Sequence, residues 1–251
     1  LGKWTSGSLS YTDGTLGGIK VDGTSFHHGG HYPGYSVGAF AVLGDYCWFT
    51  KDTDFVIDES ARRVFKHTLM TLRDYCNLRD WGVGVSGRHP FNGAIPEKDV
   101  EAFARLALLG DLTGSGLSAD PELGGAYLSL GGKDKELQAA MKQAGVKPYM
   151  PQEGFRVYNY GGFGIHRRGD WMMTLKGYNS DVWSTEIYAA DNRFGRYISY
   201  GSAQLIGSEG ADASGYIQEG WDWNRYPGVT SIHLPFEMLE SPLPGTLMER
   251  N

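Results

Sequence analysis

Cysteine, net positive charge and long apolar runs are all scarce in this sequence, and each shortage excludes a class of protein. Only Cys47 and Cys76 occur among the 251 residues, too few for a disulfide framework and without the spacing of a metal site. We therefore expect both thiols to be buried as small apolar groups. The net charge of −6 argues against a general nucleic-acid-binding surface. The longest apolar runs, such as VGAFAVLG at 37–44, are far shorter than the roughly 20 residues that a membrane-spanning helix needs.

Glycine and aromatic residues are, by contrast, plentiful. The chain has 37 glycines and 13% aromatic residues, which indicates many turns and many flat rings of the kind that stack on sugars. The hydrophobic share of 41% is enough for a real core. Because the N-terminal LGKWTSG has no initiator methionine, we expect the chain to be a piece of a longer polypeptide.

Apolar spacing predicts a helical region before about residue 146. Between 61 and 76 the apolar residues recur at the i, i+3, i+4 and i+7 intervals of a helix, and Asp58 is a suitable N-cap. Gly145 suits the left-handed position that follows a helix end. Further helices are predicted at 37–49, 97–110 and 133–144.

After about residue 146 the spacing of apolar residues changes toward a period of two. FRVYNYGGFGIHRRGDWMMTLKGY places an Arg-Gly-Asp turn between aromatic-rich runs, which predicts a hairpin of strands. RYISYGSAQLI and VTSIHLP are further strand candidates. We therefore expect a helical domain at 1–146 and the start of a β-rich domain at 147–251.

The segment DGTSFHHGGHYPGY at 22–35 is the first candidate for chemistry. His28 and Tyr35 are separated by glycines and a proline that can fold the backbone back and bring an imidazole and a phenol to one cleft. Two other interpretations stay open at this point. One is a glycine-rich turn with surface histidines, and the other is a zinc site built from His27, His28 and His31.

Three later segments are less specific when each is taken alone. WGVGVSGRHPFNG carries Arg88 and His89 on a glycine-rich stretch, although most loop arginines form surface ion pairs. STEIYAADNRFGRYISYG is a polar strand and turn with Glu186, Asn192 and Arg193. GWDWNRYPG is explained by core packing about as well as by a sugar-stacking platform.

Taken together, these segments resemble the polysaccharide lyases of the hyaluronate, chondroitin AC and chondroitin ABC type, and most closely the ABC type. The family pattern Asp-Gly-Ser-Phe-x-x-His followed by Tyr-x-Gly-x-Tyr is similar to DGTSFHHGGHYPGY. SGRHPF resembles the segment with the family's arginine, TEIYAADN resembles Glu-x-x-Asn-x-Glu-Asn, and EGWDWNRYPGVTSIHLP resembles the ABC-type sequence that follows. Ala189 departs from the family pattern, which has Asn at that position. The similarity runs in order from about residue 20 to the end.

The resemblance implies a multidomain α+β protein, with the C-terminal part of an incomplete (α/α) toroid followed by the start of an antiparallel β-sandwich domain. It implies β-elimination at the uronic acid of chondroitin or dermatan sulfate, with no cofactor or resident metal required, by a secreted or periplasmic enzyme. The partner would be a sulfated glycosaminoglycan, with neither nucleic acid nor membrane involved. The alternatives are a lyase for hyaluronan or another uronate polysaccharide, and a non-catalytic glycosaminoglycan-binding fragment.

The resemblance also implies roles for individual residues. Tyr35 would carry protons between C5 and O4 and would be transiently ionised next to Arg88. His28 would lie near the uronate carboxylate, whose charge polar side chains neutralise, and Glu186 would orient Arg88 or Tyr35. For iduronate a second base is needed, and the candidates are His28 and a histidine outside this sequence. Five residues are expected to contact substrate: His27, His31, His89, Asn192 and Arg193.

Overall fold

The computed structural model describes residues 1–182, 186–188, 202–242 and 248–250. Within these ranges no helix is both long and apolar enough to cross a membrane. The chain divides into two compact units that interleave along the sequence. The helical unit comprises Leu1–His27, Tyr35–Asp74 and Ile95–Gln152. The sheet unit comprises His28–Gly34, Tyr75–Ala94 and Glu153–Asn251.

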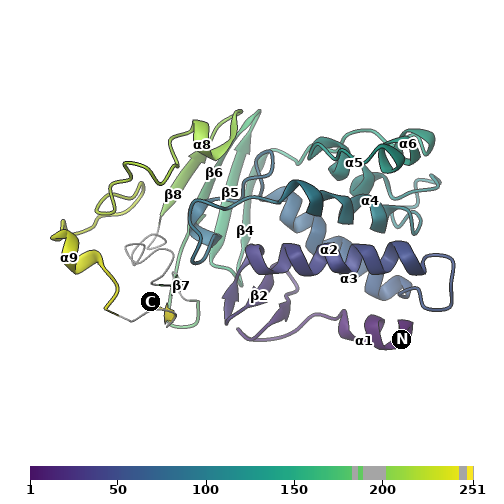
Figure 1. The fold of residues 1–251 in the computed structure, drawn as a ribbon, viewed down its shortest axis with the longest axis horizontal. Helices are drawn as coiled ribbons and strands as arrows, with labels where there is room; N and C mark the ends of the chain where they lie inside the picture. The colour runs from purple at the N-terminus through teal and green to yellow at the C-terminus, as the bar shows by residue number, and fades with distance from the viewer. Residues whose placement is uncertain (183–185, 189–201, 243–247, 251) are drawn as a thin grey trace. The chain divides into compact units, whose positions relative to one another are not determined.

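Helices dominate the helical unit, together with the short antiparallel pair of β1 and β2 (Figure 1). In chain order its elements are α1 (Gly2–Ser8), β1 (Gly18–Ile19), β2 (Ser25–His27), α2 (Pro33–Thr50, whose first two residues belong to the sheet unit), α3 (Glu59–Asp74), η2 (Glu97–Val100), α4 (Glu101–Ala107), α5 (Pro121–Ser129) and α6 (Lys135–Gln143).

The predicted helices are confirmed. The prediction for 37–49 lies inside α2, and the later ones coincide with α3, with η2 plus α4, and with α6. Asp58 caps α3, since its Oδ1 accepts the Ala61 N–H at 2.9 Å. Gly145 has φ +73°, the left-handed conformation expected after a helix end.

Helix α5 was not predicted, because its apolar pattern is interrupted by Gly124 and Gly125. A cap on its first turn stabilises it. The buried Asp120 carboxylate accepts the N–H groups of Glu122 and Leu123 and pairs with Lys66 Nζ at 2.7 Å.

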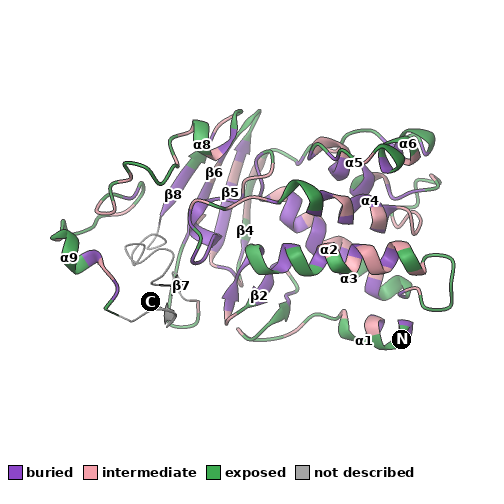
Figure 2. Ribbon diagram, viewed as in Figure 1, coloured by how far each residue is buried: buried purple, intermediate pink, exposed green. Residues whose placement is uncertain are grey.

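Apolar faces of these helices form the core of the helical unit (Figure 2). Phe40 and Phe65 lie 5.8 Å apart between ring centroids, and Leu69 is also fully buried. Cys47 has no exposed surface, and burial raises its pKa to about 12. Cys76 of the sheet unit is equally buried, so both thiols are packing groups, as predicted.

The sheet unit is built on a four-stranded antiparallel sheet in the order β4-β5-β6-β8. Its elements are β3 (Gly30–His31), η1 (Val83–Val85), β4 (Gly154–Tyr158), β5 (Phe163–Arg168), β6 (Trp171–Lys176), β7 (Glu186–Tyr188), β8 (Ala203–Ile206), α8 (Gly210–Ala213), α9 (Phe236–Leu239) and β9 (Met248–Arg250). Strand β7 pairs with β9.

The predicted hairpin is confirmed and the last predicted strand is wrong. Arg168 of β5 pairs with Trp171 of β6 across a turn in which Gly169 has φ +55°. Residues 229–235, by contrast, form no strand. There the Leu234 N–H and the Ser231 hydroxyl bond to Asn224, so local side-chain and loop contacts replace a ladder.

The segment 75–94, which carries Arg88, is anchored to the sheet by a buried amide. Asn77 Nδ2 donates to the carbonyls of Ile206 and Gly207 at 3.1 and 2.9 Å. Arg167, a buried residue of β5, donates to Asn77 Oδ1 at 3.0 Å and to the Cys76 carbonyl at 2.7 Å. These contacts fix the position from which the glycine-rich stretch starts.

Candidate functional site

His28 occupies a strained position next to a buried carboxylate. Its φ of +55° is unusual for a residue other than glycine, and such strain is often found at functional sites. His28 Nδ1 lies 2.8 Å from Oε1 of Glu186, a residue 158 positions later that has no exposed surface.

Arg88 completes a group of three with His28 and Glu186, all within the sheet unit. Arg88 Nε lies 3.3 Å from Glu186 Oε2, and its Nη2 lies 3.3 Å from His28 Nδ1. A carboxylate only accepts and a guanidinium only donates. Since the Glu186 contact is the shorter one, we assign a proton to Nδ1, which donates to Glu186.

Tyr32 is a member of this group that the sequence did not single out. Its side chain is 1% exposed, and its hydroxyl accepts the backbone N–H and the Nε–H of Arg88 at 3.1 and 3.3 Å. Burial raises the pKa of the Tyr32 phenol, whereas the hydrogen bonds from Arg88 lower it by less. Tyr32 is therefore a neutral support for the guanidinium.

Gly87 is what allows Tyr32 to lie so close to this turn. Gly87 has φ +59°, and a Cβ on it would lie 2.3 Å from the Tyr32 Cζ atom. The residue before the arginine must therefore lack a side chain. Two sequence signals could have pointed to Tyr32: the glycine in SGRHPF and the first tyrosine of the family pattern Tyr-x-Gly-x-Tyr, which corresponds to Tyr32 in DGTSFHHGGHYPGY.

Replacing Tyr32 by Phe should destabilise the sheet unit by about 1–3 kcal/mol, because two buried donors of Arg88 lose their acceptor. Urea unfolding measures this free energy. Tyr226→Phe is the matched control, since Tyr226 is also buried but no described arginine donates to its hydroxyl. Equal destabilisation by both substitutions would contradict the support of Arg88 by Tyr32.

Tyr35 lies in the helical unit, in the first turn of α2. Its side chain is 42% exposed, and its ring contacts the ring of His27 with 4.5 Å between centroids. His27 is likewise exposed. Both rings are thus open on at least one side, as groups that meet a substrate must be.

The remaining predicted contact residues have different surroundings. His31 is 6% exposed and packs its ring against Tyr75 and Phe163, which suits a packing role better than contact with a sugar. His89 is exposed and lines a cavity of about 180 Å³ together with Arg88 and Trp223. Asn192 and Arg193 lie outside the described residues.

The zinc alternative for the histidines finds no support in the described ranges. Within residues 1–182, 186–188, 202–242 and 248–250, no three His, Cys, Asp or Glu side chains are placed so that they could hold a metal ion. The histidines instead have separate neighbours: Tyr35 for His27, Glu186 for His28 and Tyr75 for His31.

Comparison with known families accounts for both parts of the chain. Residues 1–136 match the family model described as "Lyase, catalytic". Residues 153–237 match the model described as "Polysaccharide lyase family 8, super-sandwich domain". The chain belongs to polysaccharide lyase family 8.

Members of this family with curated names are similar along most of the chain. The chondroitin sulfate ABC endolyase of Proteus vulgaris is 40% identical over 233 residues, which is 93% of this chain and 22% of that protein. The chondroitin sulfate ABC exolyase of Bacteroides thetaiotaomicron is 32% identical over 95% of this chain and 26% of its own length. The chain thus spans about a quarter of these relatives.

Solved structures of family 8 lyases show the same fold. The Streptomyces coelicolor A3 chondroitin AC lyase, in complex with chondroitin sulphate, matches with a TM-score of 0.71 over 93% of this chain and 35% of that one. A Paenibacillus xanthan lyase matches with a TM-score of 0.70 over 90% of this chain and 23% of its own. Both are 16% identical to this chain, and they confirm the predicted fold class of a partial toroid followed by the start of a β-sandwich.

Proposed function

We propose that the polypeptide containing this chain cleaves chondroitin sulfate, and dermatan sulfate as well, by β-elimination at the uronic acid. The observation that carries the proposal is the buried ion pair of Glu186 with Arg88, which also holds His28 at 2.8 Å. The names of the ABC endolyase and exolyases among its relatives support the choice of substrate.

β-Elimination at a uronate requires removal of the C5 proton, stabilisation of the charge that spreads into the carboxylate, and protonation of the departing O4. A preorganised cation stabilises such charge without reorganising during the reaction. Arg88 meets this need, since the Tyr32 hydroxyl accepts its Nε–H and the Glu186 carboxylate forms an ion pair with it at 3.3 Å. We assign it to the uronate carboxylate.

Tyr35 is our candidate for the proton transfers, because its transiently ionised phenolate can take the proton from C5 and the phenol so formed can return it to O4, which regenerates the phenolate. The assignment of Tyr35 rests on the motif, in which Tyr35 follows His28 by seven positions. The 42% exposure of the Tyr35 side chain is compatible with this role. For glucuronate the proton removed from C5 and the proton delivered to O4 are on the same face of the sugar, so one tyrosine serves both steps. For iduronate the two transfers are on opposite faces, and His28 Nε2 is our candidate for the second base.

Glu186 is a positioning residue in this scheme. It keeps one proton on His28 Nδ1 and holds the Arg88 guanidinium, so it sets the tautomer of one group and the direction of the other. The sequence led us to expect Arg88 as a partner of Glu186. His28 is a further partner of Glu186, which the sequence did not predict.

Substrate contacts are proposed at the cavity that adjoins Arg88. His89 and Asn92 line it with Gln218, and the rings of Phe91 and Trp223 line it too, so the cavity combines hydrogen-bonding groups with aromatic surface, as sugars require. Asn192, Arg193 and His27 remain proposed contacts on the basis of the sequence. We further propose a secreted or periplasmic enzyme that needs no cofactor.

A substrate panel tests the function. The natural full-length polypeptide is mixed with chondroitin sulfate, dermatan sulfate, hyaluronan and heparin, and the ultraviolet absorbance of the unsaturated uronate is followed. A rise with chondroitin sulfate is expected, and its persistence after chelation of divalent cations would support the absence of a required metal. A rise with hyaluronan or heparin alone would favour another lyase, and binding without any rise would favour a non-catalytic binding protein.

A further inference from the structure

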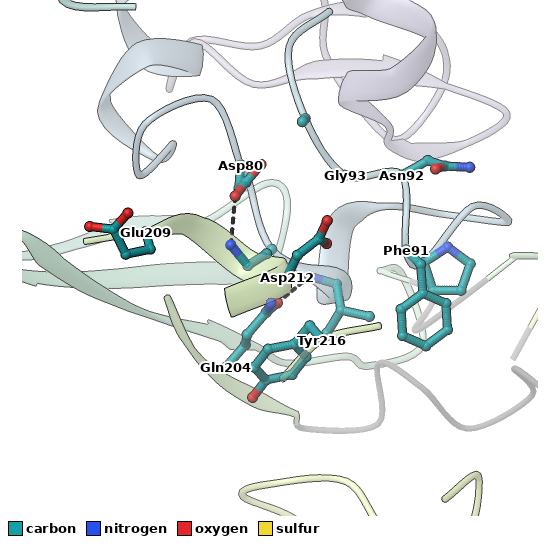
Figure 3. Close-up of a pocket in the computed structure, with 13 residues that line it drawn as sticks. Asp80, Phe91, Asn92, Gly93, Gln204, Glu209, Asp212 and Tyr216 are labelled. Atoms are coloured by element: carbon teal, nitrogen blue, oxygen red, sulfur yellow. Dashed lines mark hydrogen bonds between the residues drawn. The ribbon is translucent and has the colours of Figure 1, made fainter. Parts of the chain in front are cut away.

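A second cavity, of about 320 Å³, lies in the sheet unit (Figure 3). It is next to the cavity that adjoins Arg88. The two cavities share Pro90, Phe91 and Asn92 as lining residues. The volume of the second cavity falls at the lower end of the range for small-molecule sites, about 300–1,000 Å³. A polymer bound at Arg88 could therefore continue into it.

Three carboxylates line this second cavity: those of Asp80, Glu209 and Asp212 (Figure 3). Among its described lining residues no arginine, lysine or histidine balances them. Burial raises the pKa of Asp80 and the charge of Asp212 raises it further, whereas the hydrogen bond from the Ala211 N–H and the nearby charge of Arg79 lower it by less. The cavity therefore disfavours anions, unlike the first cavity, whose described lining includes Arg88 and no carboxylate.

A metal ion is not the ligand that this cavity fits. The carboxylates of Asp80, Glu209 and Asp212 do not form a group that could chelate a cation within the described part of the chain. Asp80 Oδ2 is already engaged, since it accepts the Ala211 N–H at 2.7 Å. Carboxylates spread around a cavity in this way suit the separate hydroxyl groups of a polyol.

Gln204 adds an amide to the wall of the cavity. It is 2% exposed, and its Oε1 accepts the Val83 N–H at 2.5 Å, which fixes the amide (Figure 3). No other group of the described chain bonds to the Gln204 amide, so Nε2 keeps its two protons for a ligand. This donor is accessible from the cavity and can bind an acceptor such as a carbonyl or ring oxygen.

Two aromatic rings provide apolar surface at the same cavity. Phe91 and Tyr216 both line it, and Trp221 packs against both of them, with 5.4 and 5.5 Å between ring centroids. Trp221 therefore holds the two rings in place. Rings of fixed orientation beside carboxylates and an amide are typical of saccharide sites.

We infer that this second cavity is a remote subsite for a neutral N-acetylhexosamine and that its carboxylates exclude a sulfated one. The inference rests on the proposed function, since it assumes that the polymer is bound at Arg88. Hydroxyl groups of the sugar donate to Glu209 and Asp212, and Gln204 Nε2 donates to an acceptor of the sugar. A sulfate in the same place would meet three carboxylates.

The test compares sulfated with unsulfated chondroitin. In the natural full-length polypeptide, the double substitution Glu209→Gln and Asp212→Asn should raise kcat/KM for chondroitin sulfate relative to unsulfated chondroitin by about three- to tenfold, because two exposed negative charges are removed. Glu219→Gln is the control, since Glu219 is an exposed acid of the same region that does not line the cavity. It should leave the ratio unchanged.

A binding measurement separates this inference from the proposed activity. Saturation-transfer NMR on the unsubstituted protein should detect N-acetylgalactosamine and give a weaker signal for its 6-sulfate, and Tyr216→Ala should remove the signal of the neutral sugar. Absence of cleavage with this binding intact would contradict the proposed function alone. An unchanged kcat/KM ratio in the double variant, or equal binding of both sugars, would overturn the subsite.

Discussion

Replacement of Tyr35 by Phe is expected to reduce chondroitin sulfate cleavage by about 10³-fold, the loss typical of a missing general acid and base. The substitution removes one hydroxyl and keeps the ring, whose face contacts His27. Since the side chain is 42% exposed at the start of α2, the fold should keep its stability within about 0.5 kcal/mol. Initial rates of unsaturated-uronate formation measure the first effect and urea unfolding the second.

Tyr46→Phe is the matched control for this prediction. Tyr46 lies on the same helix, and its hydroxyl donates to the Phe55 carbonyl at 2.5 Å. Its loss should lower stability by about 1 kcal/mol and leave the rate per folded molecule unchanged. If Tyr35→Phe retained full activity on glucuronate substrates, the scheme with a single tyrosine would be wrong.

Substitution of Glu186 should have the largest effect on stability. Glu186→Ala leaves Arg88 buried without its carboxylate, and the expected destabilisation is about 3–5 kcal/mol. Glu186→Gln keeps the shape but not the charge, so it should fold and yet lose about 10²-fold in kcat, because neither the His28 tautomer nor the direction of Arg88 is still fixed. Urea unfolding and steady-state kinetics measure the two effects.

Glu59→Gln provides the comparison, because Glu59 also pairs with an arginine but at the surface. Its contact with Arg63 is an exposed pair on one helix, with 65% of the Glu59 side chain accessible. The expected loss of stability is below about 1 kcal/mol. Similar costs at positions 59 and 186 would show that the buried pair does not hold the site together.

Local patterns were sufficient to predict most of the secondary structure. A helix such as α3 and a hairpin such as β5 with β6 depend on neighbouring residues, namely Asp58 as a cap and Gly169 in a turn. Helix α5 and the absent strand at 229–235 were exceptions. There Asp120 and Asn224 capture backbone groups, a competition that the spacing of apolar residues does not reveal.

The motifs by themselves pointed to the family, the fold class and four site residues, with His28, Tyr35 and Arg88 expected to act at the uronate and Glu186 expected to orient Arg88 or Tyr35. Only the tertiary structure decided which groups meet. In the structure Glu186 contacts His28 across 158 positions, the Tyr32 hydroxyl accepts a hydrogen bond from Arg88, and His31 is buried among aromatic rings. Composition and spacing report what one segment can do alone, whereas a hydrogen bond between distant segments depends on how the chain folds between them.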